Sequence, residues 1–175
     1  MFEKYRKFLF SKRVAKQQPR NVRFPVYDDI KTVLLLYQSD ETDQNKEIND
    51  IVSLLLHDGK TVDTFGYADK RRIVSPDLPQ SRMICRKDVS FSLRPKKEIM
   101  SELITHKYDL LIDLTMQYCL PLHYTAMYAD AVFKTGRHIV DGLHDMMIDM
   151  PQNGNPMSLY NQIIHFLNII KSNDK

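Results

Sequence analysis

Glycine is scarce in this sequence, and its scarcity rules out two common kinds of nucleotide site. The five glycines among 175 residues all stand singly, at positions 59, 66, 136, 142 and 154. Phosphate-binding loops and dinucleotide folds need clustered glycines, because backbone amides must approach the phosphate without a side chain in the way. The turn that would serve this purpose, residues 38–43, carries three carboxylates instead, Asp40, Glu41 and Asp43. Classical NAD binding and P-loop chemistry are therefore not expected.

Cysteines and long apolar runs are also sparse. Cys85 and Cys119 belong to no Cys-x-x-Cys pair or Cys/His cluster, which is typical of reduced structural thiols rather than zinc ligands. No apolar run approaches the ~20 residues of a membrane-spanning helix. The first residues, Met-Phe-Glu-Lys-Tyr-Arg-Lys, return to charge too soon for the ~7 to 15 apolar residues of a secretory signal. We expect a cytoplasmic protein.

Positive charge is concentrated at the start of the chain. The whole chain has a net charge of +3, whereas residues 1–23 hold eight basic residues against Glu3, a net +7, so the remainder carries −4. We expect a basic arm and linker at residues 1–25, followed by a single α/β domain at residues 26–175.

Residues 2–14 have the pattern of a short basic amphipathic helix. Phe2, Tyr5, Phe8 and Leu9 recur at roughly helical spacing. Basic side chains stand between and after them and form a candidate basic surface of Lys4, Arg6, Lys7, Lys12, Arg13 and Lys16. Such a helix either packs its aromatic stripe on the body and leaves its lysines in water, or contacts an acidic protein, an anionic membrane surface or a nucleic acid.

The body alternates aliphatic segments with helical patterns. Lys107–Thr115 has four aliphatic residues with one embedded carboxylate and predicts a central strand that is buried on both faces. Thr32–Tyr37 predicts the first strand. Shorter strands are expected at residues 61–65, 82–85, 133–136 and 146–150, and a long loop at residues 67–80.

Four helices are expected in the body. The first ends at Gly59, where a left-handed residue is favoured, and Pro95 suits the first turn of the second. Pro121 opens the third, which runs to about Ala129, and Ser158 caps the fourth. The apolar residues expected to face the core are Ile48, Ile51, Val52, Leu55 and Leu56 in the first helix, Ile99, Met100, Leu103 and Ile104 in the second, and Leu159, Ile163, Phe166, Leu167 and Ile170 in the fourth.

Strands that alternate with helices predict a parallel sheet with helices on both faces. The expected fold class is α/β, a three-layer Rossmann-like sandwich with a mainly parallel sheet of about five or six strands and an N-terminal helical arm. We place the first and the central strand side by side at the switch point, where the strand order reverses.

Ligands of such sheets bind at the carboxyl ends of the strands beside the switch point. The candidate ligand-binding residues there are Asp40, Glu41, Asp113, Thr115, Arg137 and His144. Asp40 or Glu41 with Asp113 would form an oxygen-rich pair suited to Mg²⁺, and Arg137 would suit an anion. The same acids can instead cap a helix, bond to neighbouring amides, or belong to a phosphate-accepting receiver domain. No metal or cofactor is assigned.

Two histidines offer other chemistry. His144 lies between Asp141 and Asp145, which would suit a tuned general base or an ordinary loop histidine. Cys119 and His123 are four residues apart, as in a thiolate pair or as in a buried cysteine beside a hydrogen-bonded histidine.

Two resemblances extend this interpretation. Tyr108–Thr115 followed by Ala129–Arg137 resembles the end of the N-terminal Rossmann half of lipopolysaccharide heptosyltransferase-like glycosyltransferases, although the Gly-rich first turn and the sugar-nucleotide half of that family are missing. Over its full length the chain is similar to an uncharacterised family of small bacterial proteins. The segments that carry this second resemblance are Arg-Lys-Phe-Leu at 6–9, Tyr-Asp-Asp-Ile-Lys at 27–31, Leu-Ile-Asp-Leu at 111–114 and Lys-Thr-Gly at 134–136. It implies a fold and a compartment.

The sequence contains no catalytic motif, so we interpret the chain as a binding or interaction module whose basic arm contacts an acidic partner. The alternative is a small enzyme or ligand sensor with a metal- or anion-dependent site at the carboxyl edge of the sheet, similar to the acceptor half of a glycosyltransferase.

Overall fold

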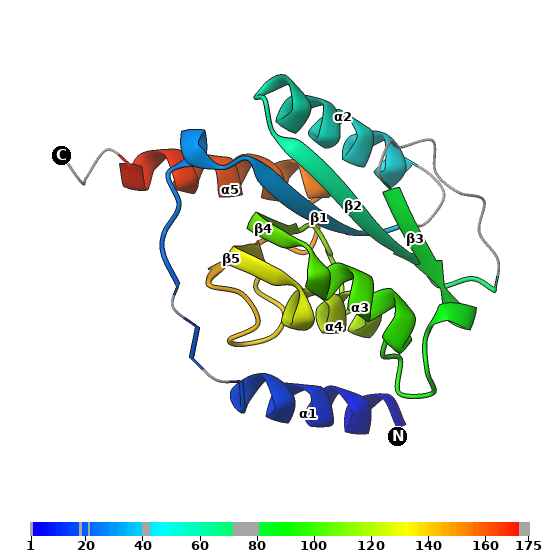
Figure 1. The fold of residues 1–175 in the computed structure, drawn as a ribbon. Coiled ribbons are helices and arrows are strands. Elements are labelled where there is room, and N and C mark those ends of the chain that lie inside the picture. Colours follow the sequence, from blue (N-terminus) through cyan, green and yellow to red (C-terminus); the bar gives the residue numbers. More distant parts are fainter. Residues whose placement is uncertain (1, 18, 21, 40–42, 72–80, 172–175) are drawn as a thin grey trace.

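Six parallel strands form one sheet in the order β3-β2-β1-β4-β5-β6, which is the strand order of the Rossmann fold (Figure 1). The structure is a computed structural model that describes residues 2–17, 19–20, 22–39, 43–71 and 81–171. The strands are β1 Thr32–Gln38, β2 Thr61–Ala68, β3 Ser81–Cys85, β4 Lys107–Asp113, β5 Asp130–Arg137 and β6 Met146–Ile148. In β1 and β4, Val33 lies opposite Leu110 and Leu36 opposite Asp113. The α/β class and the pairing at the switch point are therefore confirmed.

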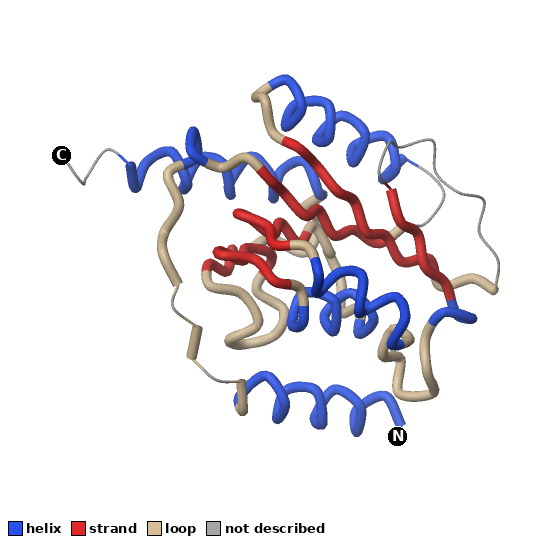
Figure 2. Tube along the Cα trace, viewed as in Figure 1, coloured by secondary structure: helices blue, strands red, loops and turns tan. Residues whose placement is uncertain are grey.

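Helices cover both faces of the sheet, as Figure 2 shows. They are α1 Phe2–Ala15, α2 Asp43–His57, α3 Lys97–Thr105, α4 Leu120–Tyr128 and α5 Pro156–Lys171, with short 3-10 turns η1 Tyr27–Asp29 and η2 Arg86–Asp88. Helices α2 and α5 lie on one face, α3 and α4 lie on the other, and α1 packs outside α4 (Figure 1).

Alternate residues of each strand belong to two separate cores. In β1, Leu34 and Leu36 pack with α1, α3 and α4, whereas Val33, Leu35 and Tyr37 pack with α2 and α5. Because both faces are covered, the strands are aliphatic throughout rather than alternating with polar residues. This explains why β1 and β4 were the clearest strands in the sequence.

Two helix starts differ from the prediction. Pro95 lies before α3, whose N-cap is Lys96, and it forms an isolated antiparallel bridge with Val89. In α5, Pro156 takes the first turn, and Asn155 rather than Ser158 is the cap, since Asn155 Oδ1 accepts a hydrogen bond of 2.8 Å from the backbone N–H of Ser158. Ser158 Oγ accepts a bond of 3.0 Å from the Asn155 N–H in return.

The core stripes are mostly as predicted, with three exceptions. Leu56, Ile104 and Phe166 are exposed rather than buried. Each lies at the edge of its stripe, where the helix turns from the sheet toward solvent. The side chain of Ile170, and residues 72–80 of the long loop, lie outside the described part of the chain.

Helix α1 forms as predicted but does not pack on the body through its predicted aromatic stripe. Phe10 and Val14 are its buried residues. The Phe10 ring lies 4.9 Å from the Tyr124 ring, edge to face, and is stacked on His123 at 6.0 Å. The body therefore holds α1 by one side and leaves the stripe of Phe2, Tyr5, Phe8 and Leu9 in solvent.

Candidate functional site

The carboxyl end of β4 brings three of the predicted site residues together. Asp113 is almost fully buried at the last position of the strand. Its Oδ1 accepts a hydrogen bond of 3.0 Å from the backbone N–H of Thr115, and its Oδ2 lies 3.1 Å from His144 Nε2. Burial acts to raise the pKa of Asp113, but the hydrogen bond and charge of His144 outweigh it and hold the pKa below its usual value.

A glycine makes room for this pair. Gly136 of β5 lies opposite Asp113. A Cβ atom there would come within 2.9 Å of Asp113 Cβ and of His144 Cε1, and within 3.0 Å of the Asp113 carbonyl oxygen. Gly136 is therefore needed for close approach rather than for an unusual backbone conformation.

The acids that flank His144 in sequence are not its partners. Asp141 Oδ1 lies 2.6 Å from His138 Nε2, and Asp145 forms an ion pair with Arg20. His144 instead turns inward to Asp113, and its Nδ1 is buried without a hydrogen-bond partner among the described residues. The side chains of His144 and Asp113 are only 3% and 2% exposed, so the pair is shielded from solvent.

The Arg137 side chain is hydrogen-bonded to the surrounding backbone. Its guanidinium donates to the carbonyl oxygens of Met116, Met150 and Pro151, the last two at 3.1 and 3.4 Å. These bonds tie the segment after β4 to the segment after β6. The predicted anion-binding arginine thus has a structural role in the geometry seen here.

The structure does not describe the two acids that were predicted to bind magnesium together with Asp113. Asp40 and Glu41 lie among the residues that are not described, so their distance from Asp113 stays a prediction. Within the described ranges, no three His, Cys, Asp or Glu side chains are grouped so that they could hold a metal ion.

Cys119 and His123 are both buried but do not form a thiolate pair. Burial raises the pKa of Cys119 to about 12 and lowers the pKa of His123 to about 4, so both are neutral near pH 7. Neither ring nitrogen of His123 has a hydrogen-bond partner within the described part of the chain. Cys119 is buried, as expected. His123 was expected to be hydrogen-bonded, but among the described residues its ring packs against those of Phe10 and Tyr118 without a hydrogen bond.

Two adjoining hollows open at the carboxyl edge. One of about 190 Å³ lies at the switch point between Tyr37 and Leu114, and one of about 480 Å³ lies beside Arg137 and His138. Met116 and Gln117 line both. Asp113, Thr115 and His144 line neither, because they point into the protein beneath this edge.

The outward face of α1 is a second candidate site. We define it as Phe2, Tyr5, Phe8 and Leu9, which are between 39% and 73% exposed, together with the exposed Lys4, Lys12, Arg13 and Lys16. Lys12 Nζ lies 4.5 Å from the centre of the Phe8 ring. Large apolar side chains and cations are therefore interleaved on one convex surface.

Three residues of the predicted basic surface contact aromatic rings of the body: Arg6, Lys7 and Arg13, whose guanidinium lies 6.0 Å from the centre of the Tyr124 ring. The Arg6 guanidinium is 4.8 Å from the centre of the Phe91 ring. Lys7 Nζ is 2.9 Å from Glu3 Oε1 and 4.5 Å from the centre of the Tyr118 ring. Phe91 is 83% exposed and extends the apolar surface beside α1.

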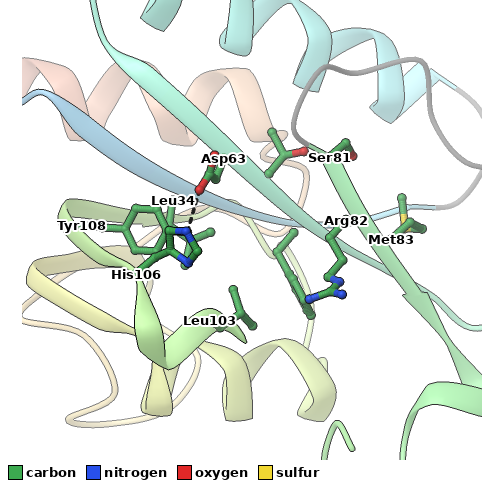
Figure 3. A pocket seen from close by; sticks show the side chains of 10 residues that line it. Leu34, Asp63, Ser81, Arg82, Met83, Leu103, His106 and Tyr108 are labelled. Carbon is green, nitrogen blue, oxygen red and sulfur yellow. Dashed lines mark hydrogen bonds between the residues drawn. The ribbon is translucent and has the colours of Figure 1, made fainter. Parts of the chain in front are cut away.

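Sequence reasoning missed a third hollow, which is near the amino ends of the strands. It is larger, about 630 Å³, and contains Asp63, Arg82 and Tyr108 (Figure 3). These residues come from three different strands, so no local motif marks them. The sequence indicated this hollow only by two charged residues, Asp63 and Arg82, within strands that are otherwise mostly apolar.

The comparisons with known proteins identify a family. A family model described as a family of unknown function, DUF6913, matches residues 3–170. The chain belongs to the DUF6913 family. The match includes α1 as well as the sheet, so the basic helix is part of what DUF6913 describes. No curated protein and no solved structure matches the chain.

No helix in the described part of this DUF6913 protein is long and apolar enough to cross a membrane.

Proposed function

We propose that the protein is a non-catalytic binding module that docks on an anionic membrane surface through the outward face of α1. The observation that carries this proposal is the exposure of Phe2, Tyr5, Phe8 and Leu9 on a helix that is fixed to the body by Phe10. A helix that needed only to cover the core would place its aromatic residues on the buried side.

The chemistry of this face favours lipid over the other acidic partners. Phe2, Phe8 and Leu9 have no hydrogen-bonding side-chain groups, and they project from a convex helix rather than from a groove. An interfacial helix inserts such residues between headgroups, while lysines at its flanks meet the lipid phosphates. Each basic residue at an anionic surface contributes about 1 kcal/mol, so Lys4, Lys12 and Lys16 together contribute about 3 kcal/mol.

Placement of the protein in the cytoplasm belongs to the same proposal. The cytoplasmic leaflet carries anionic lipids, and the body of the chain, with a net charge of about −4, is repelled from such a surface. Attraction at α1 and repulsion of the body together orient the molecule with α1 toward the membrane.

Sedimentation of the full chain with phosphatidylcholine vesicles, with and without phosphatidylserine, tests this function. We expect binding only with phosphatidylserine, and weaker binding as salt is added. Lys12→Glu with Lys16→Glu should abolish binding, and Phe8→Ser with Leu9→Ser should weaken it. Leu56→Ser, which changes an equally exposed apolar residue on α2, is the matched control and should bind like the wild type.

Two results would count against the membrane. Absence of binding to anionic vesicles would exclude it directly. Binding of a short RNA or DNA duplex that is lost in the Lys12/Lys16 variant, without vesicle binding, would assign the same face to nucleic acid.

The second candidate function is the ligand sensor or small enzyme at the carboxyl edge, in the manner of a glycosyltransferase-like acceptor half. The adjoining hollows at Met116 and Gln117 favour it, because they lie at the switch point where such folds bind ligands. A thermal-shift screen with Mg²⁺, nucleotides and nucleotide sugars tests it. A rise in the midpoint that Gln117→Ala removes would support this function, and no rise with any of them would exclude it.

A further inference from the structure

The turn between η2 and α3, residues 89–95, holds an exposed phenylalanine beside α1; we call it the Phe91 turn. Phe91 is 83% exposed, more than any other large apolar side chain among the described residues. The turn reaches toward the N-terminal end of α1 (Figure 1), where the Arg6 guanidinium lies 4.8 Å from the centre of the Phe91 ring. Arg6 contacts one part of this ring and leaves most of it in solvent.

Phe91 continues the apolar surface of α1. Arg6 is four residues after Phe2 and three before Leu9, so these three residues lie on one flank of the helix. Phe2 and Leu9 belong to the outward face of α1, and Phe91 lies against the same flank through Arg6. Two segments that are about eighty residues apart in the sequence therefore form one exposed apolar surface.

The backbone of the turn fixes this position of Phe91. The Ser90 N–H donates a hydrogen bond of 2.8 Å to the Arg94 carbonyl, and the Leu93 N–H donates one of 2.9 Å to the Ser90 carbonyl. Leu93 has a left-handed φ of 61°, which leucine rarely adopts, and its side chain packs against the core. The turn thus directs Leu93 inward, whereas Phe91 stays in solvent.

The residues around the turn are basic, although the body as a whole is acidic. Residues 86–97 hold five basic side chains against Asp88, a net charge of +4, in a body whose net charge is about −4. Among them, Lys87, Lys96 and Lys97 are exposed and form no ion pair within the described ranges. This charge favours an anionic surface as the partner, because a second copy of the chain would bring the same basic residues against one another.

We propose that the Phe91 turn is a second point of contact with the anionic membrane, and this inference rests on the proposed docking of α1. Phe91 inserts between headgroups, and Lys87, Lys96 and Lys97 meet the lipid phosphates. A helix alone leaves the molecule free to roll about the helix axis. A second contact beside the helix fixes which side of the body faces the membrane. The turn offers a single apolar side chain, so its contact depends on α1.

Tryptophan fluorescence of the full chain tests this contact. The chain contains no tryptophan, so a single introduced one reports on its own position. With vesicles of phosphatidylcholine and phosphatidylserine, emission of Phe91→Trp should move to shorter wavelength and should be quenched by lipids brominated on the acyl chains. Phe8→Trp on α1 should respond in the same way. Leu56→Trp, at an exposed position of α2, is the control and should show neither change.

The two reporters separate this inference from the proposed function. A response of Phe8→Trp without one of Phe91→Trp would overturn the second contact and leave docking by α1 standing. No response of either would overturn both. A response of Phe91→Trp alone would show that the turn binds without α1, and would contradict both the two-point contact and the proposed function.

Substitutions measure how much the turn contributes. In vesicle sedimentation, Phe91→Ser should weaken binding by about fivefold or more, and so should Lys96→Glu with Lys97→Glu. Both variants change exposed side chains, so the fold should be kept. Binding equal to the wild type in both would overturn the proposal. A dimer in light scattering that Phe91→Ser dissolves, with no response of Phe91→Trp to vesicles, would assign the turn to a second copy of the chain instead.

Discussion

At the scale of single residues, the buried polar groups beneath the carboxyl edge depend on close packing. Asp113 is satisfied by Thr115 and His144, whereas His123 and Nδ1 of His144 have no hydrogen-bond partner among the described residues. A buried polar group without a hydrogen bond lowers the free energy of unfolding by about 1–3 kcal/mol, so these groups reduce the stability of the fold.

Gly136→Ala should reduce the free energy of unfolding by about 1–3 kcal/mol, because the added Cβ meets Asp113 and His144 in a core that cannot relax freely. Urea unfolding measures the change. In a His144→Ala background the contact with the imidazole is removed, and the same substitution should cost less. An equal cost in both backgrounds would show that the contact with Asp113 alone sets the penalty.

His123 should make the protein less stable in acid. Burial lowers the pKa of His123 from 6.5 to about 4, so between these values the unfolded chain binds a proton that the folded chain does not. Stability from this group is therefore full above pH 6.5 and is lost as the pH falls toward 4, by up to about 3 kcal/mol. Asp113 and His144 face His123, and the lowered pKa of Asp113 adds a loss in the same direction.

Urea unfolding from pH 7 to pH 4 isolates this effect when the wild type is compared with His123→Leu. The variant should lose less stability over this range. His57→Gln, at a highly exposed histidine on α2, should follow the wild type. Parallel pH curves for the wild type and His123→Leu would show that His123 does not titrate as argued.

At the scale of elements, one side of α1 packs on the body and the other side is exposed to solvent. Phe10→Ala should lower the free energy of unfolding by about 3–5 kcal/mol, since it removes a fully buried ring from contact with Tyr124 and His123. Phe8→Ala is the matched control, because Phe8 is 53% exposed on the same helix. It should change stability by less than about 0.5 kcal/mol.

The strands could be predicted from sequence because a strand buried on both faces is aliphatic throughout. Helix starts were less predictable, since Pro95 and Ser158 each fit the expected position by residue type, while hydrogen bonds to neighbouring residues decide the boundary. The orientation of α1 could not be predicted. Phe8 and Phe10 are both aromatic, and only the shape of the surface formed by α4 and the loop before β6 selects Phe10.

The candidate sites were less predictable than the fold, because their partners are distant in sequence. The position of Asp113 at the end of β4 followed from the topology, and its closeness to His144 followed from both residues reaching the same edge. The turn of His144 away from Asp141 and Asp145 could not be predicted, since it depends on the space that Gly136 leaves. Asp63 and Arg82 come together only through the β2–β3 register.

At the scale of the whole molecule, the distribution of charge follows the layers of the fold. The basic helix α1 lies on the opposite side of the sheet from α2 and α5 (Figure 1). Residues 1–23 carry a charge of +7 and the rest of the chain about −4, so positive charge is concentrated toward the side on which α1 lies.

Removal of residues 1–20 tests whether α1 is a detachable arm or part of the body. The truncation removes the buried Phe10 and Val14, and with them hydrogen bonds of 3.2 Å from Gln17 to the Met127 carbonyl and 2.7 Å from Arg20 to the Ala131 carbonyl. Burial of the two apolar side chains alone contributes about 4 kcal/mol.

We expect the truncated chain to melt at least several degrees below the full chain in calorimetry and to bind a hydrophobic dye, because the surface that α1 covers on α4 becomes exposed. The full chain with Lys12→Glu and Lys16→Glu keeps both buried residues and should melt like the wild type. An unchanged midpoint in the truncated chain would instead show that residues 21–175 fold independently of α1. Vesicle binding could then be tested on that fragment alone, which should not bind if α1 carries the contact.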